Sequence, residues 1–115
     1  MRVIIAGSRT IIDPLEVDKA IADSGFEITK VICGGAQGVD LLGSKYAFSH
    51  DLPIQYFLPD WKQYGKAAGP IRNSEMAQNA DALILVWDGK SRGSNDMLNK
   101  ANAKDLKVYC HLVIQ

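Results

Sequence analysis

Glycine and arginine residues gather in four short segments, and each segment follows an apolar run typical of a strand. The segments are Gly7-Ser8-Arg9, Gly34-Gly35-Ala36-Gln37-Gly38-Val39-Asp40, Gly69-Pro70-Ile71-Arg72-Asn73 and Asp88-Gly89-Lys90-Ser91-Arg92-Gly93-Ser94. Glycine lets a backbone approach a phosphate closely. The guanidinium group of arginine donates paired hydrogen bonds to phosphate oxygens. Together these residue types indicate a site for an anionic, phosphate-bearing ligand.

The glycine-rich segment 34–38 and the pair Gly93-Ser94 each lead into a predicted helix. Helix N-termini offer N–H groups and a partial positive charge, and both favour an anion. We therefore expect a phosphate to lie over Gly34, Gly35 and Gly38.

The other candidate ligand-binding residues surround this phosphate. Arg9 and Arg72 are expected to clamp it, while Asp40 or Asn73 contacts ribose hydroxyl groups. Trp61 and Tyr64 either stack on a base or pack their long loop against the protein. The full candidate set is Gly7, Ser8, Arg9, Gly34, Gly35, Gly38, Asp40, Arg72, Asn73, Gly93 and Ser94, of which the last two close the opposite side.

Several familiar motifs are absent from the sequence. The segment around Lys90 lacks the Gly-Lys-Ser/Thr ending of a P-loop, and the glycines of segment 34–38 do not have the Gly-x-Gly-x-x-Gly spacing. His50 and His111 lie far apart, and no cysteine stands at a zinc-ligand spacing from either. We therefore expect neither a metal nor a cofactor.

Five apolar runs alternate with segments of helical periodicity. The predicted strands are 3–6, 28–33, 53–58, 82–87 and 107–113. Asp13 is expected to cap the first helix, with Pro14 as its first residue and Glu16 completing a capping-box-like spacing. Pro70 is expected to open the third helix and Ser94 to cap the fourth.

The alternation of strands and helices predicts an α/β fold, namely a Rossmann-like, doubly wound, mainly parallel five-stranded sheet with helices on both faces. A chain of 115 residues suits one domain, which spans 1–115. In open α/β sheets, ligands bind at the carboxyl ends of the strands, near a switch in strand order. All four glycine and arginine segments fall at that edge of the sheet.

The composition restricts the possible partners. Thirteen Lys and Arg residues balance thirteen Asp and Glu residues, whereas proteins that grip the nucleic-acid backbone usually carry a basic excess. Low net charge gives little repulsion against self-association. Cys33 and Cys110 both lie in apolar runs, so we expect both to be buried and reduced. Since no apolar run reaches 18 residues, we expect a cytoplasmic protein without a membrane partner.

The four segments, together with residues 61–73, resemble the small SLOG-superfamily domain of YspA/YpsA-like type. The resemblance covers nearly the whole chain. It implies a Rossmann-like domain that binds a nucleotide or a nucleotide-derived small molecule. It also implies a homodimer or a larger homo-oligomer.

A second resemblance is to the Lonely guy phosphoribohydrolases, which cut the base from a nucleoside 5′-monophosphate. Their Arg-Lys-x-x-Met helix start is similar to Arg72-Asn73-Ser74-Glu75-Met76, with asparagine in place of lysine. The glutamate of their glycine loop falls on Leu42, which can neither stabilise an oxocarbenium ion nor activate water. If the protein is such an enzyme, the candidate catalytic residues are Asp40, Arg72 and Glu75.

The loop 34–40 also resembles the Gly-x-Ala-Arg-Gly-x-Asp loop of the DNA-processing protein A family, which binds single-stranded DNA. Gln37 replaces the arginine of that loop, which removes a phosphate contact. Nucleotide binding, for sensing, carrying or sequestering a ligand, is therefore the favoured function. Phosphoribohydrolase activity is the alternative, and single-stranded DNA binding ranks third.

Overall fold

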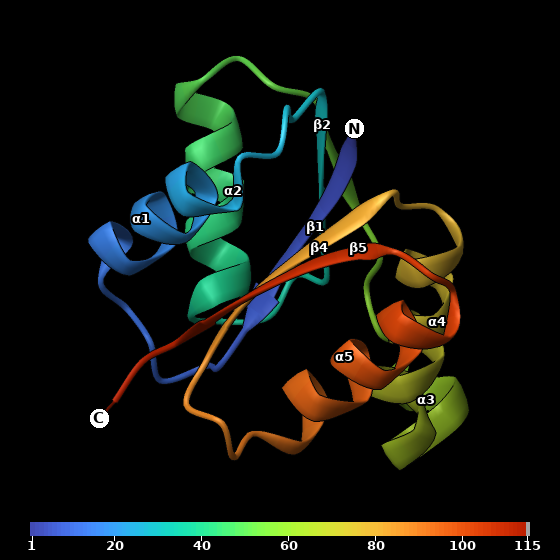
Figure 1. Cartoon of the computed structure of the whole chain (residues 1–115). Helices are drawn as coiled ribbons and strands as arrows, with labels where there is room; N and C mark the ends of the chain where they lie inside the picture. Colours follow the sequence, from blue (N-terminus) through green and yellow to red (C-terminus); the bar gives the residue numbers. More distant parts are fainter. Residues whose placement is uncertain (115) are drawn as a thin grey trace.

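Five parallel strands form a sheet that lies between two layers of helices (Figure 1). A computed structural model describes residues 1–114. The strands are β1 (Arg2–Gly7), β2 (Lys30–Cys33), β3 (Ile54–Tyr56), β4 (Ala82–Trp87) and β5 (Lys107–Leu112). Their order is β3-β2-β1-β4-β5, and every neighbouring pair is parallel. The predicted Rossmann-like, doubly wound α/β fold is confirmed, and the strand order switches between β1 and β4.

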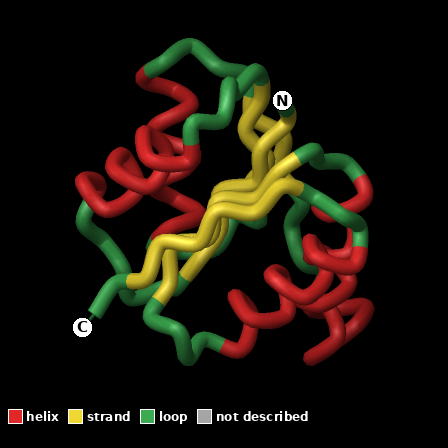
Figure 2. The backbone as a smooth tube through the Cα atoms, in the orientation of Figure 1, coloured by secondary structure: helices red, strands yellow, loops and turns green. Residues whose placement is uncertain are grey.

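The helices divide between the two faces of the sheet (Figure 2). Helices α1 (Pro14–Ser24) and α2 (Val39–Ser49) cover one face. Helices α4 (Ala68–Gln78) and α5 (Arg92–Ala103) cover the other, with the short α3 (Trp61–Tyr64) and a 3-10 turn (Gly65–Ala67) preceding α4. Among residues 1–114, no helix is long and apolar enough to cross a bilayer.

The core consists of two apolar clusters, one on each face of the sheet. Val3 and Ile5 of β1 belong to the cluster under α1 and α2. Ile4 and Ala6 belong to the cluster under α4 and α5. Because successive side chains of a strand point to opposite faces, both clusters draw on the same strand. This arrangement explains why β1 is a continuous apolar run rather than an alternating one.

The start of α1 confirms one half of the predicted capping arrangement. Asp13 Oδ1 accepts a hydrogen bond from the Leu15 N–H at 3.0 Å, and Pro14 is the first helical residue. The other half is wrong. Glu16 Oε2 lies 2.7 Å from Nε2 of His111, so this carboxylate pairs with β5.

The other helix starts differ from the predictions. Helix α4 begins at Ala68, and Pro70 lies in its first turn rather than at its first position. Ser91, not Ser94, caps α5, because Ser91 Oγ accepts from the Ser94 N–H at 3.4 Å. Ser94 instead lies in the first turn of α5, where its side chain is buried.

The two cysteines have different surroundings. Cys33 of β2 is buried, as predicted, and burial raises the pKa of its thiol to about 12. Cys110 is exposed, so the prediction that it is buried was wrong. The physical reason is that β5 is an edge strand, whose side chains the helices cover only in part.

Gly43→Ala is expected to lower the free energy of unfolding. A Cβ at this position of α2 would lie 2.8 Å from Ile5 Cγ2 and 2.9 Å from Ile5 Cβ. Overpacking of this kind costs about 1–3 kcal/mol, against roughly 1 kcal/mol that alanine gains over glycine in a helix. Urea denaturation followed by circular dichroism measures the net loss.

Gly93→Ala is the matched control for this substitution. A Cβ at Gly93 meets no atom within 4 Å, and alanine favours a helix over glycine by about 0.5–1 kcal/mol. We expect the stability of this variant to be unchanged or increased. If Gly43→Ala were as stable as the wild type, the tight contact of α2 with β1 would be refuted.

Candidate functional site

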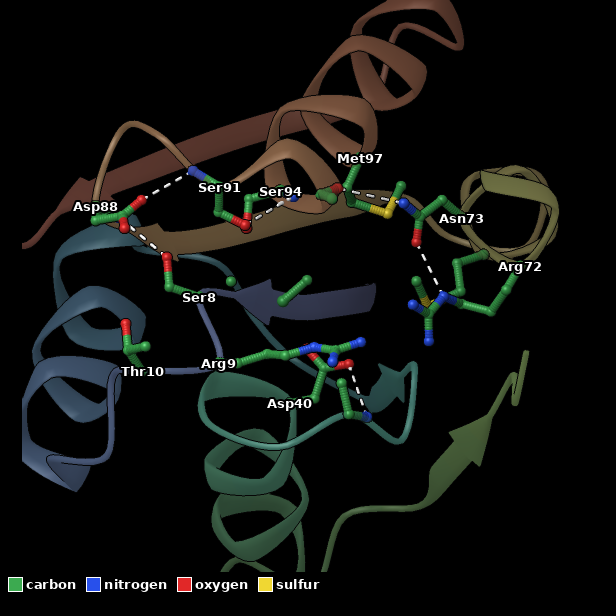
Figure 3. A pocket seen from close by; sticks show the side chains of 15 residues that line it. Ser8, Arg9, Thr10, Asp40, Arg72, Asn73, Asp88, Ser91, Ser94 and Met97 are labelled. Carbon is green, nitrogen blue, oxygen red and sulfur yellow. Dashed lines mark hydrogen bonds between the residues drawn. The ribbon is translucent and has the colours of Figure 1, made fainter. Parts of the chain in front are cut away.

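A cavity of about 360 Å³ lies where the strand order switches, at the carboxyl ends of β1 and β4 (Figure 3). We call it the β1–β4 cavity. The loops after β1, β2 and β4 and the helices α2, α4 and α5 contribute to its wall. Its lining residues are Ala6, Gly7, Ser8, Arg9, Thr10, Ala36, Asp40, Arg72, Asn73, Met76, Asp88, Ser91, Gly93, Ser94 and Met97.

A second cavity, of about 270 Å³, adjoins the first. We call it the loop cavity, because the glycine-rich loop after β2 forms one of its walls. It is lined by Arg9, Gly34, Gly35, Ala36, Gln37, Pro59, Trp61 and Arg72. Since Arg9, Ala36 and Arg72 line both cavities, the two guanidinium groups stand at the boundary between them.

Hydrogen bonds fix the loop between β4 and α5. Ser8 Oγ accepts from the Asp88 N–H at 3.1 Å. Asp88 Oδ1 accepts in turn from the N–H groups of Lys90 at 2.8 Å and Ser91 at 3.0 Å. These backbone donors lower the pKa of Asp88. The loop therefore holds the N-terminus of α5 at the wall of the β1–β4 cavity.

Ser94 has a buried hydroxyl group that no group within residues 1–114 satisfies. Its side chain lines the β1–β4 cavity, the residue is 4% exposed, and Oγ has no hydrogen-bond partner among the described residues. An unpaired buried polar group costs about 1–3 kcal/mol. The N–H groups of a first helical turn also lack intrahelical acceptors. This part of the wall therefore holds hydrogen-bonding capacity that the described residues leave unused.

Asp40 and two arginines form the charged part of the site. Asp40 is 5% exposed, and its Oδ2 accepts from the Ala36 N–H at 3.3 Å. Burial raises the pKa of Asp40, while the Ala36 N–H, Arg72, the Gly34 N–H and Arg9 oppose that rise. Figure 3 shows the side chain of Arg9 reaching past Asp40 towards Arg72. The carboxyl group therefore lies close enough to both arginines to interact with their charges.

Hydrogen bonds on two sides hold Arg72 in place. Its Nη1 donates to the Gly34 carbonyl, and its Nε donates to Asn73 Oδ1 at 3.0 Å. Burial lowers the pKa of Arg72, and Asp40 opposes this effect. A Cβ at Gly34 would lie 2.3 Å from Arg72 Nη1, so only a glycine leaves room for this contact.

Asn73 ties Arg72 to α5. Its Nδ2 donates to Asp96 Oδ2 at 2.9 Å and to the Gly93 carbonyl at 3.3 Å. Lys100 Nζ donates to Asp96 Oδ2 at 2.8 Å. Because both polar atoms of the Asn73 amide are engaged, this residue orients Arg72. The sequence analysis missed Asp96 and Lys100, although their i,i+4 spacing on a helix was a readable signal.

The structure brings most of the predicted ligand-binding residues together. The β1–β4 cavity is lined by Gly7, Ser8, Arg9, Asp40, Arg72, Asn73, Gly93 and Ser94, and the loop cavity by Gly34 and Gly35. Gly38 lines neither cavity. A Cβ there would lie 2.4 Å from the Ser8 carbonyl oxygen, so this glycine allows α2 to meet the loop after β1.

The candidate catalytic residues do not all meet. Asp40 and Arg72 line the β1–β4 cavity, whereas Glu75 is exposed on α4 and lines neither cavity. Leu42 is buried in the core under α1 and α2. Within residues 1–114, no group of three or more His, Cys, Asp or Glu side chains is placed to hold a metal ion.

Several lining residues were not predicted from the sequence. Thr10, Met76, Asp88, Ser91 and Met97 were not among the ligand-binding candidates. Thr10 and Asp88 follow the ends of β1 and β4 within a few residues, and this position at the switch in strand order was their signal.

The stability of Asp40→Asn relative to the wild type is expected to rise with pH. Burial raises the folded-state pKa of Asp40 above its ordinary value of 3.8. Above the pKa of Asp40 in the unfolded chain, the unfolded state loses its proton while the folded state still keeps it. Wild-type stability therefore falls as the pH rises, until the folded-state pKa is passed. Asparagine does not titrate, so wild-type stability falls relative to the variant by at most about 1.4 kcal/mol per pH unit. Urea denaturation at a series of pH values measures the difference.

Asp88→Asn is the control with the opposite sign. Because the folded-state pKa of Asp88 is lowered, its contribution is present above the unfolded pKa and is lost only at more acidic pH. The stability difference for this variant should stay level above about pH 5. A wild type that gained stability over Asp40→Asn with rising pH would show that the two arginines outweigh burial.

Comparisons with known proteins agree with this architecture. DNA processing protein A (DprA) from Streptococcus pneumoniae has a solved structure that is similar with a TM-score of 0.75 at 18% identity. The similarity covers 95% of this chain and 49% of the DprA chain, so this protein spans about half the length of that structure. At this level of identity, the likeness shows the fold alone.

Sequence comparisons identify the family. Gene 61 protein of Mycobacterium phage D29 is 31% identical over 117 residues, which cover 93% of each chain. The family model for the YspA, cpYpsA-related SLOG family matches residues 1–64, a span that includes the loops after β1 and β2. The chain belongs to the YspA, cpYpsA-related SLOG family.

Proposed function

We propose that this protein binds a nucleotide or a nucleotide-derived small molecule, which it senses, carries or sequesters. The single observation that carries the proposal is the buried, unpaired hydroxyl of Ser94 in the wall of a cavity that two arginines also line. An unsatisfied buried hydroxyl favours a ligand that supplies the missing hydrogen bond. The arginines favour a ligand that carries a phosphate.

The phosphate is proposed to lie between Arg9 and Arg72, beside the loop 34–37. The described residues that line the loop cavity include two arginines and no Asp or Glu. The amino end of α2 also contributes positive potential there, because Gly38 is its N-cap. These features favour negative charge at the boundary of the two cavities.

The nucleoside is proposed to occupy the β1–β4 cavity. Oxygen atoms of Ser8, Asp40 and Ser94 stand among its lining residues and suit ribose hydroxyls or base amino groups. Met76 and Met97 are buried core residues beneath this wall, so the floor of the cavity next to them is apolar. A cavity with apolar surface and a few oriented polar groups is the usual form of a small-molecule site.

A phosphoribohydrolase reaction is the second candidate, and the position of Asp40 favours it. Leu42 stands where phosphoribohydrolases have a glutamate. Asp40, a buried carboxyl group that lines the β1–β4 cavity, could take the role of that glutamate. A carboxyl group with a raised pKa suits general acid or base catalysis near neutral pH. In the reaction, water adds across the N-glycosidic bond of a nucleoside 5′-monophosphate and yields free base and ribose 5-phosphate.

A ligand panel separates these functions. Purified protein is mixed with nucleoside monophosphates, dinucleotides, cyclic nucleotides and a short deoxythymidine oligonucleotide. Mass spectrometry then identifies the compounds in the filtrate and those released from denatured protein. A retained intact nucleotide supports binding, whereas free base and ribose 5-phosphate would establish the enzyme. Retention of the oligonucleotide alone would refute both and would place this protein nearer to DprA in activity.

Ser94→Ala is expected to weaken nucleotide binding without destabilising the fold. The variant loses a hydrogen bond to the ligand, which reduces affinity about 2- to 10-fold. It loses no hydrogen bond from Oγ to a described residue, so its free energy of unfolding should stay level or rise by up to about 1 kcal/mol. Titration calorimetry and urea denaturation measure the two quantities.

Ser74→Ala is the matched serine control. Its hydroxyl donates to the Pro70 carbonyl at 3.2 Å and lines neither cavity, so ligand affinity should not change. Equal affinities for Ser94→Ala and the wild type would exclude Ser94 from the ligand site.

Arg72→Ala is expected to lower nucleotide affinity about 10- to 150-fold, since a hydrogen bond to a charged group contributes about 1.5–3 kcal/mol. Arg92→Ala is the matched control, because Arg92 is exposed and lines neither cavity. Arg72→Ala should also melt at a lower temperature, because it loses its bonds to Gly34 and Asn73 and its charge beside Asp40, whereas Arg92→Ala should melt like the wild type; affinities are therefore measured at a temperature at which both variants are folded. Unchanged affinity in Arg72→Ala would refute the proposed position of the phosphate.

A further inference from the structure

We propose that the ligand is a dinucleotide whose two nucleosides are joined by a pyrophosphate. One nucleoside occupies the β1–β4 cavity, the pyrophosphate lies between Arg9 and Arg72, and the second base stacks on Trp61 in the loop cavity. This inference rests on the proposed function and specifies the class of ligand.

The shared lining of the two cavities is the first argument. Arg9, Ala36 and Arg72 line both cavities, so a ligand that extends from one cavity to the other passes both arginines. Their volumes are about 360 and 270 Å³, and sites for small molecules run from about 300 to 1,000 Å³. A mononucleotide with its phosphate at the boundary leaves the far wall of the loop cavity, Pro59 and Trp61, uncovered.

The exposure of Trp61 is the second argument. Trp61 opens α3 and lines the loop cavity, yet it is 51% exposed. A large half-exposed aromatic ring at a cavity wall is a stacking surface for another flat ring. Of the two alternatives for this tryptophan, stacking on a base and packing of its loop, the exposed half of the side chain is free for the first.

The local structure holds Trp61 in position. Asp60 caps α3, since its Oδ1 accepts from the Gln63 N–H at 3.2 Å. On the side of α4, a Cβ built on Gly69 would lie 3.6 Å from Trp61 Cη2, which is ordinary contact distance. Helix α4 therefore passes close to the indole at Gly69, where the glycine leaves room beside the ring.

The charge between the cavities is the third argument. A pyrophosphate diester carries two negative charges, and two guanidinium groups stand at the boundary. Asp40 faces the same two arginines and offsets part of their charge, so the number of phosphate oxygens makes the distinction: a pyrophosphate diester offers four non-bridging oxygens to the two guanidinium groups, and a phosphodiester offers two. Arg72 already donates to the Gly34 carbonyl and to Asn73, and the guanidinium fork has five donors, so others remain for oxygen atoms of the ligand.

The test compares matched ligands by titration calorimetry. The probes are the monophosphates of adenosine, guanosine, cytidine and uridine, and the P1,P2-dinucleoside diphosphate of each. For the preferred base, the dinucleoside diphosphate should bind about 5- to 150-fold tighter than the monophosphate, because stacking of one base contributes about 1–3 kcal/mol. The phosphodiester-linked dinucleotide of the same base and a short deoxythymidine oligonucleotide complete the set.

Trp61→Ala is the diagnostic variant. It should reduce affinity for the dinucleoside diphosphate about 5- to 150-fold and leave affinity for the monophosphate within about 2-fold. Trp61→Phe keeps a smaller stacking surface, so this variant should still bind the dinucleoside diphosphate more tightly than the monophosphate, but by a smaller factor than the wild type. Urea midpoints close to that of the wild type are expected, since this side chain is half exposed.

The outcomes separate this inference from the proposed function. A dinucleoside diphosphate that binds no tighter than its monophosphate would overturn the inference and leave nucleotide binding intact. Equal losses for both ligands in Trp61→Ala would also overturn it, since the first base would then stack there. If the phosphodiester dinucleotide or the oligonucleotide bound as tightly as the dinucleoside diphosphate, or more tightly, the proposal of a pyrophosphate link would be refuted. If no nucleotide binds, the proposed function itself fails.

Discussion

The site depends on the close pairing of β1 with β4 up to the last residue of β1. Gly7 lies opposite Val86 in the register, and a Cβ on Gly7 would stand 1.7 Å from the Val86 carbonyl oxygen. Beyond this point the segments that follow β1 and β4 diverge, since β1 leads to α1 on one face of the sheet and β4 leads to α5 on the other. The β1–β4 cavity is the space that this divergence creates, which is why the loops after both strands line it.

The parts of the fold that local sequence patterns govern were predictable. The strand predicted over 82–87 has those bounds in the structure, because a run buried on both faces ends where burial ends. Asp13 caps α1 as expected, because the cap needs only its own neighbours. The clustering of the glycine and arginine segments also followed from topology, since parallel strands end at one edge of the sheet.

Features that depend on distant residues were not predictable. Glu16 pairs with His111 and not with its own helix, a choice that only the position of β5 decides. Cys110 lies in an apolar run, but its place on an edge strand leaves it exposed. The contact of Arg72 with the Gly34 carbonyl joins residues 38 positions apart, and no spacing rule anticipates it.

The network behind Arg72 shows how a binding residue can be rigid and still keep its charge. A carboxylate at position 73 would fix the guanidinium group equally well, but it would neutralise that group. The Asn73 amide presents an oxygen to Arg72 and an amino group to Asp96, so the negative charge of Asp96 is turned towards Lys100. The amide therefore transmits orientation from α5 to Arg72 without placing a further negative charge next to the guanidinium group.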